Sequence, residues 1–136
     1  MMMKFMLDTN IVIYTMKNKP AEVQKSLQDV SHSVCLSSVT VMELVYGVEK
    51  SSRVQENMHT LEEFLARLYT APYDTSAAFH TGQLRCELRS QPIGAYDMMI
   101  AGHARSLGLI LVTNNTQEFE RVPGLRLQNW VHSTNT

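Results

Sequence analysis

Short apolar runs alternate with longer amphipathic stretches along this chain. The apolar runs consist of consecutive aliphatic residues, a pattern typical of strands that are buried on both faces. The pattern predicts three buried strands, one short extended segment and a final edge strand, at residues 4–7, 34–38, 109–113, 69–73 and 125–130.

The stretches between these strands have apolar residues at helical spacing. Residues 9–17 suit a buried helix, although their β-branched side chains leave a strand open. Asp74 is expected to cap a helix over residues 75–90, and Gly108 to end a helix over residues 96–108. The other helices are predicted at residues 20–29, with Pro20 in the first turn, and at residues 38–51 and 53–68; residues 91–95 and 114–119 are expected to form a loop and a turn.

Alternating strands and helices predict an α/β sandwich with a mostly parallel central sheet. The length of 136 residues suggests a single domain, residues 1–136, in which residues 131–136 form a frayed tail. No apolar stretch approaches the roughly 20 residues of a membrane span. The N-terminus also lacks the apolar region and cleavage site of a signal peptide. We therefore expect a cytoplasmic protein with no membrane partner.

Net charge and cysteine content exclude few classes of function. A net charge of −1 offers no global electrostatic argument for nucleic acid binding, although a local patch could still supply the field. Cys35 and Cys86 do not make a disulfide framework, and both are expected to be buried or half-buried thiols. The five histidines show no His-x-x-x-His spacing, which argues against a zinc site.

Three carboxylates stand in segments that otherwise look buried. Asp8 follows the first strand, Glu43 lies between apolar residues on the helix after the second, and Asp97 lies near the start of a later helix. Thr113 and Asn115 follow another strand. Ligands of parallel sheets bind beyond the carboxyl ends of the strands, where we expect these residues to meet. Clustered carboxylates repel one another unless a cation neutralises them, and oxygen ligands suit Mg²⁺ or Mn²⁺.

Each of these residues also has an ordinary structural interpretation. Asp8 could cap the helix that begins at Thr9, and Glu43 could lie on a helix surface. Asp97 would interact favourably with the first turn of its own helix, and Asn115 is a common turn residue. The pattern alone leaves both interpretations open.

Three segments resemble PIN-domain ribonucleases. "FMLDTNIVIY" is similar to their opening motif and "SSVTVMELVYGVEKS" to their second motif. "PIGAYDMMIAGHARSLGLILVTNNTQEFERVPGLRLQNW" resembles the C-terminal half of VapC-type toxins of bacterial toxin–antitoxin pairs. The similarity extends from Lys4 to Trp130. It implies a PIN fold and a Mg²⁺- or Mn²⁺-dependent endoribonuclease toxin that cleaves structured RNA, with tRNA as the expected target.

The resemblance also implies roles for individual residues. Asp8, Glu43 and Asp97 correspond to the acidic metal-binding triad. Asn115 stands where many PIN domains have a fourth acid, and the nearest carboxylate is Glu118. A metal-activated water would attack the phosphodiester. The residues expected to orient the metal ligands are Thr9, Asn10 and Thr113.

The resemblance implies macromolecular partners as well. It predicts a homodimer and a VapB-type antitoxin whose C-terminal segment enters the active-site groove. Operator DNA would be reached through the antitoxin. Four arginines are candidate RNA contacts, although a solvated helix face is the simpler interpretation of each: Arg85, Arg89, Arg105 and Arg121.

Other functions fit only parts of the sequence. A haloacid-dehalogenase-like phosphatase would use Asp8 as nucleophile but needs a second Asp where Asn10 stands. A catalytically weak or inactive PIN module that binds RNA or protein would keep the fold and lose the acids, yet three are present. A receiver-like module would need a lysine after the strand at residues 109–113. A dinucleotide site would need a Gly-x-Gly-x-x-Gly motif.

Overall fold

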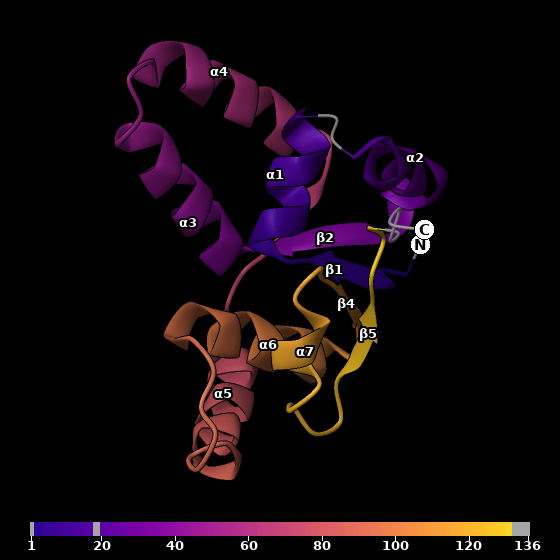
Figure 1. Ribbon diagram of the computed structural model, residues 1–136, viewed down its shortest axis with the longest axis vertical. Helices are drawn as coiled ribbons and strands as arrows, with labels where there is room; N and C mark the ends of the chain where they lie inside the picture. Colours follow the sequence, from indigo (N-terminus) through magenta and orange to yellow (C-terminus); the bar gives the residue numbers. More distant parts are fainter. Residues whose placement is uncertain (1, 18–19, 132–136) are drawn as a thin grey trace.

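A five-stranded parallel sheet lies at the centre of the computed structural model, which describes residues 2–17 and 20–131 (Figure 1). The strand order is β3–β2–β1–β4–β5, and every neighbouring pair is parallel. The strands are β1 (Phe5–Leu7), β2 (Val34–Ser37), β3 (Tyr69–Ala71), β4 (Ile110–Val112) and β5 (Arg126–Gln128). The predicted strands and the parallel sheet are thus confirmed.

Helices cover both faces of this sheet (Figure 1). Residues 9–17 form a helix, so the alternative of a strand there is wrong. One face packs mainly against α1 (Thr9–Lys17), α2 (Ala21–Val30), α3 (Ser38–Glu49) and α4 (Val54–Leu65). The other face packs against α5 (Thr75–Glu87), α6 (Ala95–Leu107) and α7 (Thr116–Phe119), and a short 3₁₀ turn, η1 (Ser31–Ser33), precedes β2.

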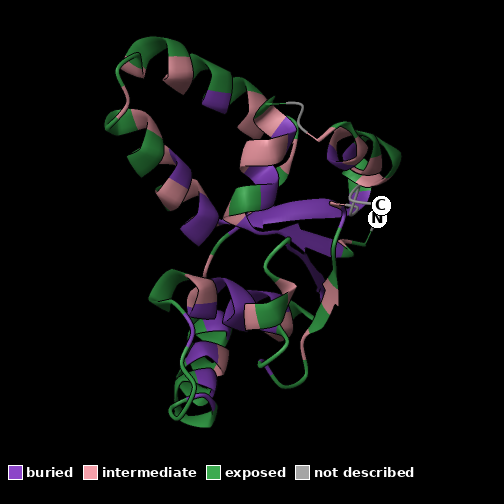
Figure 2. Cartoon of the chain, viewed as in Figure 1, coloured by how far each residue is buried: buried purple, intermediate pink, exposed green. Residues whose placement is uncertain are grey.

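The central strands are buried along their length (Figure 2). They are buried on both faces because successive side chains enter two separate cores. Met6, Cys35 and Leu111 pack in the core with α5 and α6. Their neighbours Leu7 and Leu36 pack in the core with α1, α2 and α4. This explains why the strands appear in the sequence as unbroken apolar runs rather than as alternating patterns.

The helix ends predicted from the sequence are confirmed at two positions. The Ala77 backbone N–H donates to Asp74 Oδ1 at 3.0 Å, so Asp74 caps α5. Gly108 ends α6 with φ 68, in the left-handed region that glycine adopts without steric cost.

Three local predictions are wrong. Pro20 is the N-cap of α2, with extended backbone at φ −73 and ψ 157, rather than a residue of its first turn. Residues 116–119 form the short helix α7 instead of a turn. Cys86 is exposed because it lies on the solvent side of α5, whereas Cys35 is buried as expected. The predicted frayed tail lies outside the described residues except for Val131.

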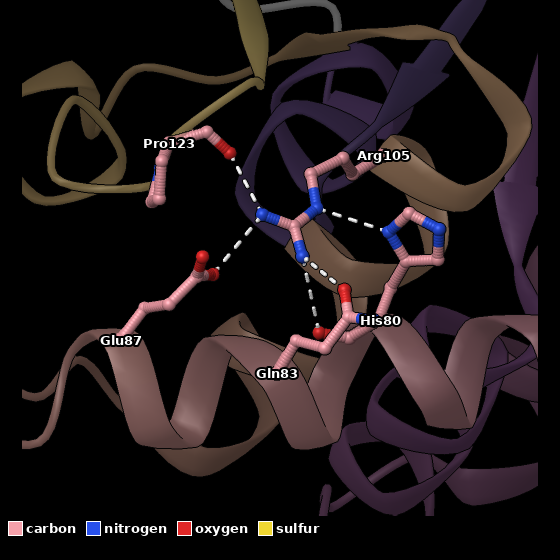
Figure 3. A network of polar contacts seen from close by, with 5 residues as sticks. All are labelled: His80, Gln83, Glu87, Arg105 and Pro123. Carbon is pink, nitrogen blue, oxygen red and sulfur yellow. Dashed lines mark hydrogen bonds and ion pairs between the residues drawn. The ribbon is translucent and has the colours of Figure 1, made fainter.

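Arg105 lies in a polar network rather than on a solvated helix face (Figure 3). Its guanidinium donates to His80 Nδ1 at 3.0 Å, Gln83 Oε1 at 3.0 Å and the Pro123 carbonyl at 2.9 Å. Its Nη1 also lies 3.3 Å from Glu87 Oε1, and its side chain is only 13% exposed. Arg105 therefore joins α6 to α5 and to the segment between α7 and β5.

No helix among residues 2–17 and 20–131 has the length and apolar character needed to cross a membrane.

Candidate active site

The order of the strands reverses between β1 and β4, which are neighbours in the sheet. From β1 the chain builds the sheet outward through β2 and β3, and it then returns to add β4 and β5 on the other side. Crevices at such switch points are the usual ligand sites of parallel sheets. Asp8 directly follows β1 and Thr113 directly follows β4, and the Asp8 backbone N–H donates to the Val112 carbonyl at 3.0 Å.

Asp8 combines a structural role with a place in the site. Its Oδ1 accepts a hydrogen bond from the Ile11 backbone N–H at 2.9 Å, so it caps the start of α1. The residue is only 4% exposed. Burial raises the pKa of Asp8 and the charge of Glu43 adds to this rise, whereas hydrogen bonds from Thr113 and Ile11 oppose it. The capping role that the sequence left open for Asp8 is therefore confirmed, while its role in binding a metal stays a prediction.

Glu43 enters the site from α3 and is half-buried. The Thr9 hydroxyl donates to Glu43 Oε1 at 2.6 Å and lies 3.4 Å from Thr40 Oγ1. A hydroxyl bound to a carboxylate in this way restricts the rotamers of both side chains. Thr9 thus links α1 to α3 beside the acids, while its role in orienting a metal ligand stays a prediction.

Asp97 lies in the first turn of α6, close to Glu118 of α7. Burial, a side-chain hydrogen bond with Glu118 and the charges of Glu118, Asp8 and Glu43 together raise the pKa of Asp97 to about 7. Three other carboxylates, from the β1–α1 junction, α3 and α7, therefore act on Asp97 at this edge of the sheet. Because α7 replaces the expected turn, Glu118 is placed next to Asp97.

The remaining predicted site residues lie at the margin. Thr113 is fully buried, and its Oγ1 accepts from the Asn115 backbone N–H at 2.9 Å. Asn115 is the N-cap residue of α7, where its side chain makes no capping hydrogen bond, and its side chain and that of Asn10 are exposed. The structure thus places Glu118 beside Asp97, and Asn115 at the start of α7 with an exposed side chain.

The donor set fits a hard divalent cation in its chemistry. Among the described residues, no three His, Cys, Asp or Glu side chains already form a group able to hold an ion. The acids nevertheless offer only oxygen ligands, and Glu118 Oε1 is buried without a hydrogen-bond donor from the described residues. A cation here would offset the repulsion that raises the pKa of Asp97.

One polar contact behind the site was missed in the sequence. His103 on α6 is 1% exposed, and its Nδ1 lies 2.8 Å from Ser37 Oγ at the start of α3. The available signal was a polar residue inside a run of small buried residues, from Ile100 to Ala104. The sequence alone does not indicate which residue forms a hydrogen bond with His103.

Comparison with known proteins places the chain beside bacterial ribonucleases. The family model described as PIN domain matches residues 5–125. The tRNA(fMet)-specific endonuclease VapC of Shigella flexneri is 56% identical over 131 residues, covering 95% of this chain and 99% of that protein. The protein of the same name from Salmonella typhimurium is 52% identical, with the same coverage. Ribonuclease VapC2 of Haemophilus influenzae is 49% identical over 96% of this chain and 100% of its own length.

Solved structures give the same relationship. A DNA-bound VapBC complex from Salmonella typhimurium superimposes with a TM-score of 0.91 and 51% identity, covering 95% of this chain and 99% of that chain. VapBC2 from Rickettsia felis, bound to a DNA fragment from its promoter, has a TM-score of 0.88 and 37% identity, covering 96% and 100%. The similarity thus extends over the sheet, both helix layers and all the elements that bear the acids.

Proposed function

The chain belongs to the PIN-domain family and to its VapC ribonucleases, and from this premise we propose that it is a metal-dependent endoribonuclease toxin that hydrolyses phosphodiester bonds of structured RNA. The expected substrate is tRNA. Two relatives that are 56% and 52% identical are named for tRNA(fMet), which makes this tRNA the first substrate to test.

The observation that supports this proposal most directly is the electrostatic coupling of the acids. The charges of Asp8, Glu43 and Glu118 all raise the pKa of Asp97, at the switch point of the sheet. Grouping like charges without compensation is unfavourable, so such clusters are typical of sites that bind a cation. A purely structural acid would instead face solvent, pair with a basic side chain or cap a helix, as Asp74 does.

We assign the chain's residues to distinct tasks. Asp8, Glu43 and Asp97 would hold Mg²⁺ or Mn²⁺, with Glu118 a stronger candidate than Asn115 for the fourth position. The bound ion supplies charge stabilisation for the phosphodiester and acidifies water. Thr9 fixes the Glu43 carboxylate through the 2.6 Å hydrogen bond. The Ile11 N–H and the Thr113 hydroxyl orient Asp8 and favour its charged form.

The proposed partners follow from the relatives. Structures of VapBC complexes, two of them bound to DNA, superimpose on this chain. We therefore propose that a VapB-type antitoxin neutralises this protein and links it to operator DNA. A homodimer and a cytoplasmic location remain parts of the same proposal.

Replacing either central aspartate tests the assignment. Asp8→Asn and Asp97→Asn should each reduce cleavage of tRNA(fMet) by about 100-fold or more, because each removes a charge from the group that binds the cation. Cleavage is measured on purified tRNA with Mg²⁺ or Mn²⁺, and growth inhibition in cells should disappear in parallel. Asp29→Asn, on the exposed side of α2, is the matched control and should cleave normally.

The competing functions predict different results. Full activity of either Asp variant would show that the metal-binding assignment is wrong. An acyl-phosphate trapped on Asp8 would favour the phosphatase mechanism. RNA binding without cleavage of any tRNA, at any divalent metal concentration, would favour a non-catalytic PIN module.

A further inference from the structure

Ser37 occupies the junction between β2 and α3 and is completely buried. Its Oγ accepts a hydrogen bond from the Val39 backbone N–H at 3.1 Å, which caps α3. The same Oγ lies 2.8 Å from Nδ1 of His103, on α6. Ser37 therefore caps the N-terminus of α3 and contacts α6.

Ser37 can take part in both hydrogen bonds at once. A hydroxyl has one proton to donate and two lone pairs, so Ser37 Oγ can accept from Val39 and still donate its proton to His103 Nδ1. A neutral imidazole can accept it. Burial lowers the pKa of His103, more strongly than the charge of Asp74 and the backbone of Pro72 raise it, which keeps the ring neutral.

An aromatic contact also holds the ring of His103. Tyr73 packs edge-to-face against it, with ring centroids 5.5 Å apart. The Tyr73 backbone N–H donates to Ser38 Oγ at 2.9 Å, and the Tyr73 hydroxyl donates to Thr81 Oγ1 at 2.8 Å. The first turn of α3 is thus tied to α6 both directly and through the segment between β3 and α5.

These contacts join the two helices that bring opposing acids to the site. α3 bears Glu43 and α6 bears Asp97, and the two helices contact each other. We propose that the His103–Ser37 hydrogen bond is a positioning contact that sets the distance between Glu43 and Asp97. The inference rests on the proposed ribonuclease function. Displacements of about 1 Å at a reacting group can cost about 100-fold in rate.

Three substitutions separate positioning from simple loss of packing. His103→Phe keeps a ring against Tyr73 but removes the acceptor, whereas His103→Asn keeps an acceptor near the Nδ1 position. Ser37→Ala removes the donor. We expect kcat for tRNA(fMet) to fall about tenfold in His103→Phe and Ser37→Ala with little change in KM, and to recover severalfold in His103→Asn.

The serine at the other end of β2 provides the matched control. Ser33 is also buried, and its hydroxyl donates to the Val30 carbonyl at 2.9 Å, but it lies at the amino end of the strand. Ser33→Ala should lower stability without changing kcat. The double variant His103→Phe/Ser37→Ala should be no slower than Ser37→Ala, because both changes remove one shared contact.

A second measurement does not depend on RNA cleavage. Mn²⁺ binding to the protein alone, followed by electron paramagnetic resonance, should weaken severalfold in His103→Phe and stay unchanged in Ser33→Ala. This measurement also distinguishes a failure of the proposed function from a failure of the proposed positioning contact. If the wild-type protein cleaves no RNA, the proposed function fails, while the Mn²⁺ titration still tests the positioning contact.

Wild-type kcat and wild-type Mn²⁺ affinity in His103→Phe would overturn the inference. Additive losses in the double variant would also overturn it. If His103→Phe does not fold, Ser37→Ala and His103→Asn provide the test. A reduced kcat in Ser37→Ala together with an active His103→Asn supports the inference. A wild-type kcat in Ser37→Ala overturns it.

Discussion

At the scale of single residues, Asp97 and Glu118 show how one carboxyl group alters the acidity of its neighbour. A half-buried carboxyl group beside another carboxyl group keeps its proton to an unusually high pH, and the pKa of Asp97 accordingly rises to about 7. Glu118 Oε1 lies nearby, buried and without a donor from the described residues. In the proposed metal site, this pair would exchange a proton for a metal ion close to neutral pH.

The prediction at this scale concerns the free energy of unfolding in the absence of metal. Between the ordinary pKa of 3.8 and about 7, the folded protein binds more protons at Asp97 than the unfolded chain does. The free energy of unfolding should therefore fall as pH rises through this range. Asp97→Asn should remove that part of the decline and make the protein more stable at pH 8 by about 1–2 kcal/mol, reduced from the full shift because the group is partly exposed.

Urea unfolding at pH 5 and pH 8, with a chelator present, checks this expectation. Glu118→Gln is a useful companion because it removes the neighbour while leaving Asp97 in place. An unchanged pH dependence in both variants would contradict the electrostatic account of Asp97.

At the scale of elements, α6 makes the contacts that hold the site together. It bears Asp97, the buried His103 and the networked Arg105. It also crosses α5 closely at Gly102: a Cβ added there would meet Thr81 Oγ1 and would lie 2.9 Å from the Thr81 backbone nitrogen. The absence of a side chain at Gly102 is what lets the two helices approach.

A pair of glycine substitutions tests this packing. Gly102→Ala should destabilise the fold by about 2 kcal/mol or more, because the backbone of α5 must move away. Gly82→Ala should instead be neutral or stabilise by up to about 1 kcal/mol, since Gly82 is an exposed helical residue with nothing within 4 Å of an added Cβ. Chemical denaturation measures both, and equal effects would contradict the close crossing.

At the scale of the whole molecule, the topology decides which residues meet. β1 and β4 are far apart in sequence but adjacent in the sheet, so the residues that follow them share one crevice. α3 and α6 then deliver acids to that crevice from separate parts of the chain. A ligand of the complete group should consequently stabilise the folded state as a whole.

Metal binding by the folded protein should raise its melting temperature. A free Mn²⁺ concentration of about 100 times Kd should add about 2.7 kcal/mol to the free energy of unfolding. The shift should appear in the wild-type protein and in the surface variant Asp29→Asn, and be lost in Asp8→Asn. Differential scanning calorimetry at pH 7.5 measures it, and an equal shift in Asp8→Asn would place the ion elsewhere.

Much of the fold could be predicted from local patterns. The runs at residues 4–7 and 109–113 indicated central strands because each is buried on both faces, and Asp74 and Gly108 marked helix ends through their own backbone chemistry. Residues 116–119 form a helix where a turn is predicted, because a helix as short as α7 leaves too little periodicity to detect.

The sequence by itself determined the strands, most of the longer helices and the three acids that stand in apolar surroundings, because these features depend on periodicity and on neighbours along the chain. Only the tertiary structure decided that Glu118 lies beside Asp97. It alone paired His103 with Ser37, and Arg105 with α5. Each such partnership joins distant segments, and its partner is set by the order of strands and the packing of helices rather than by local sequence.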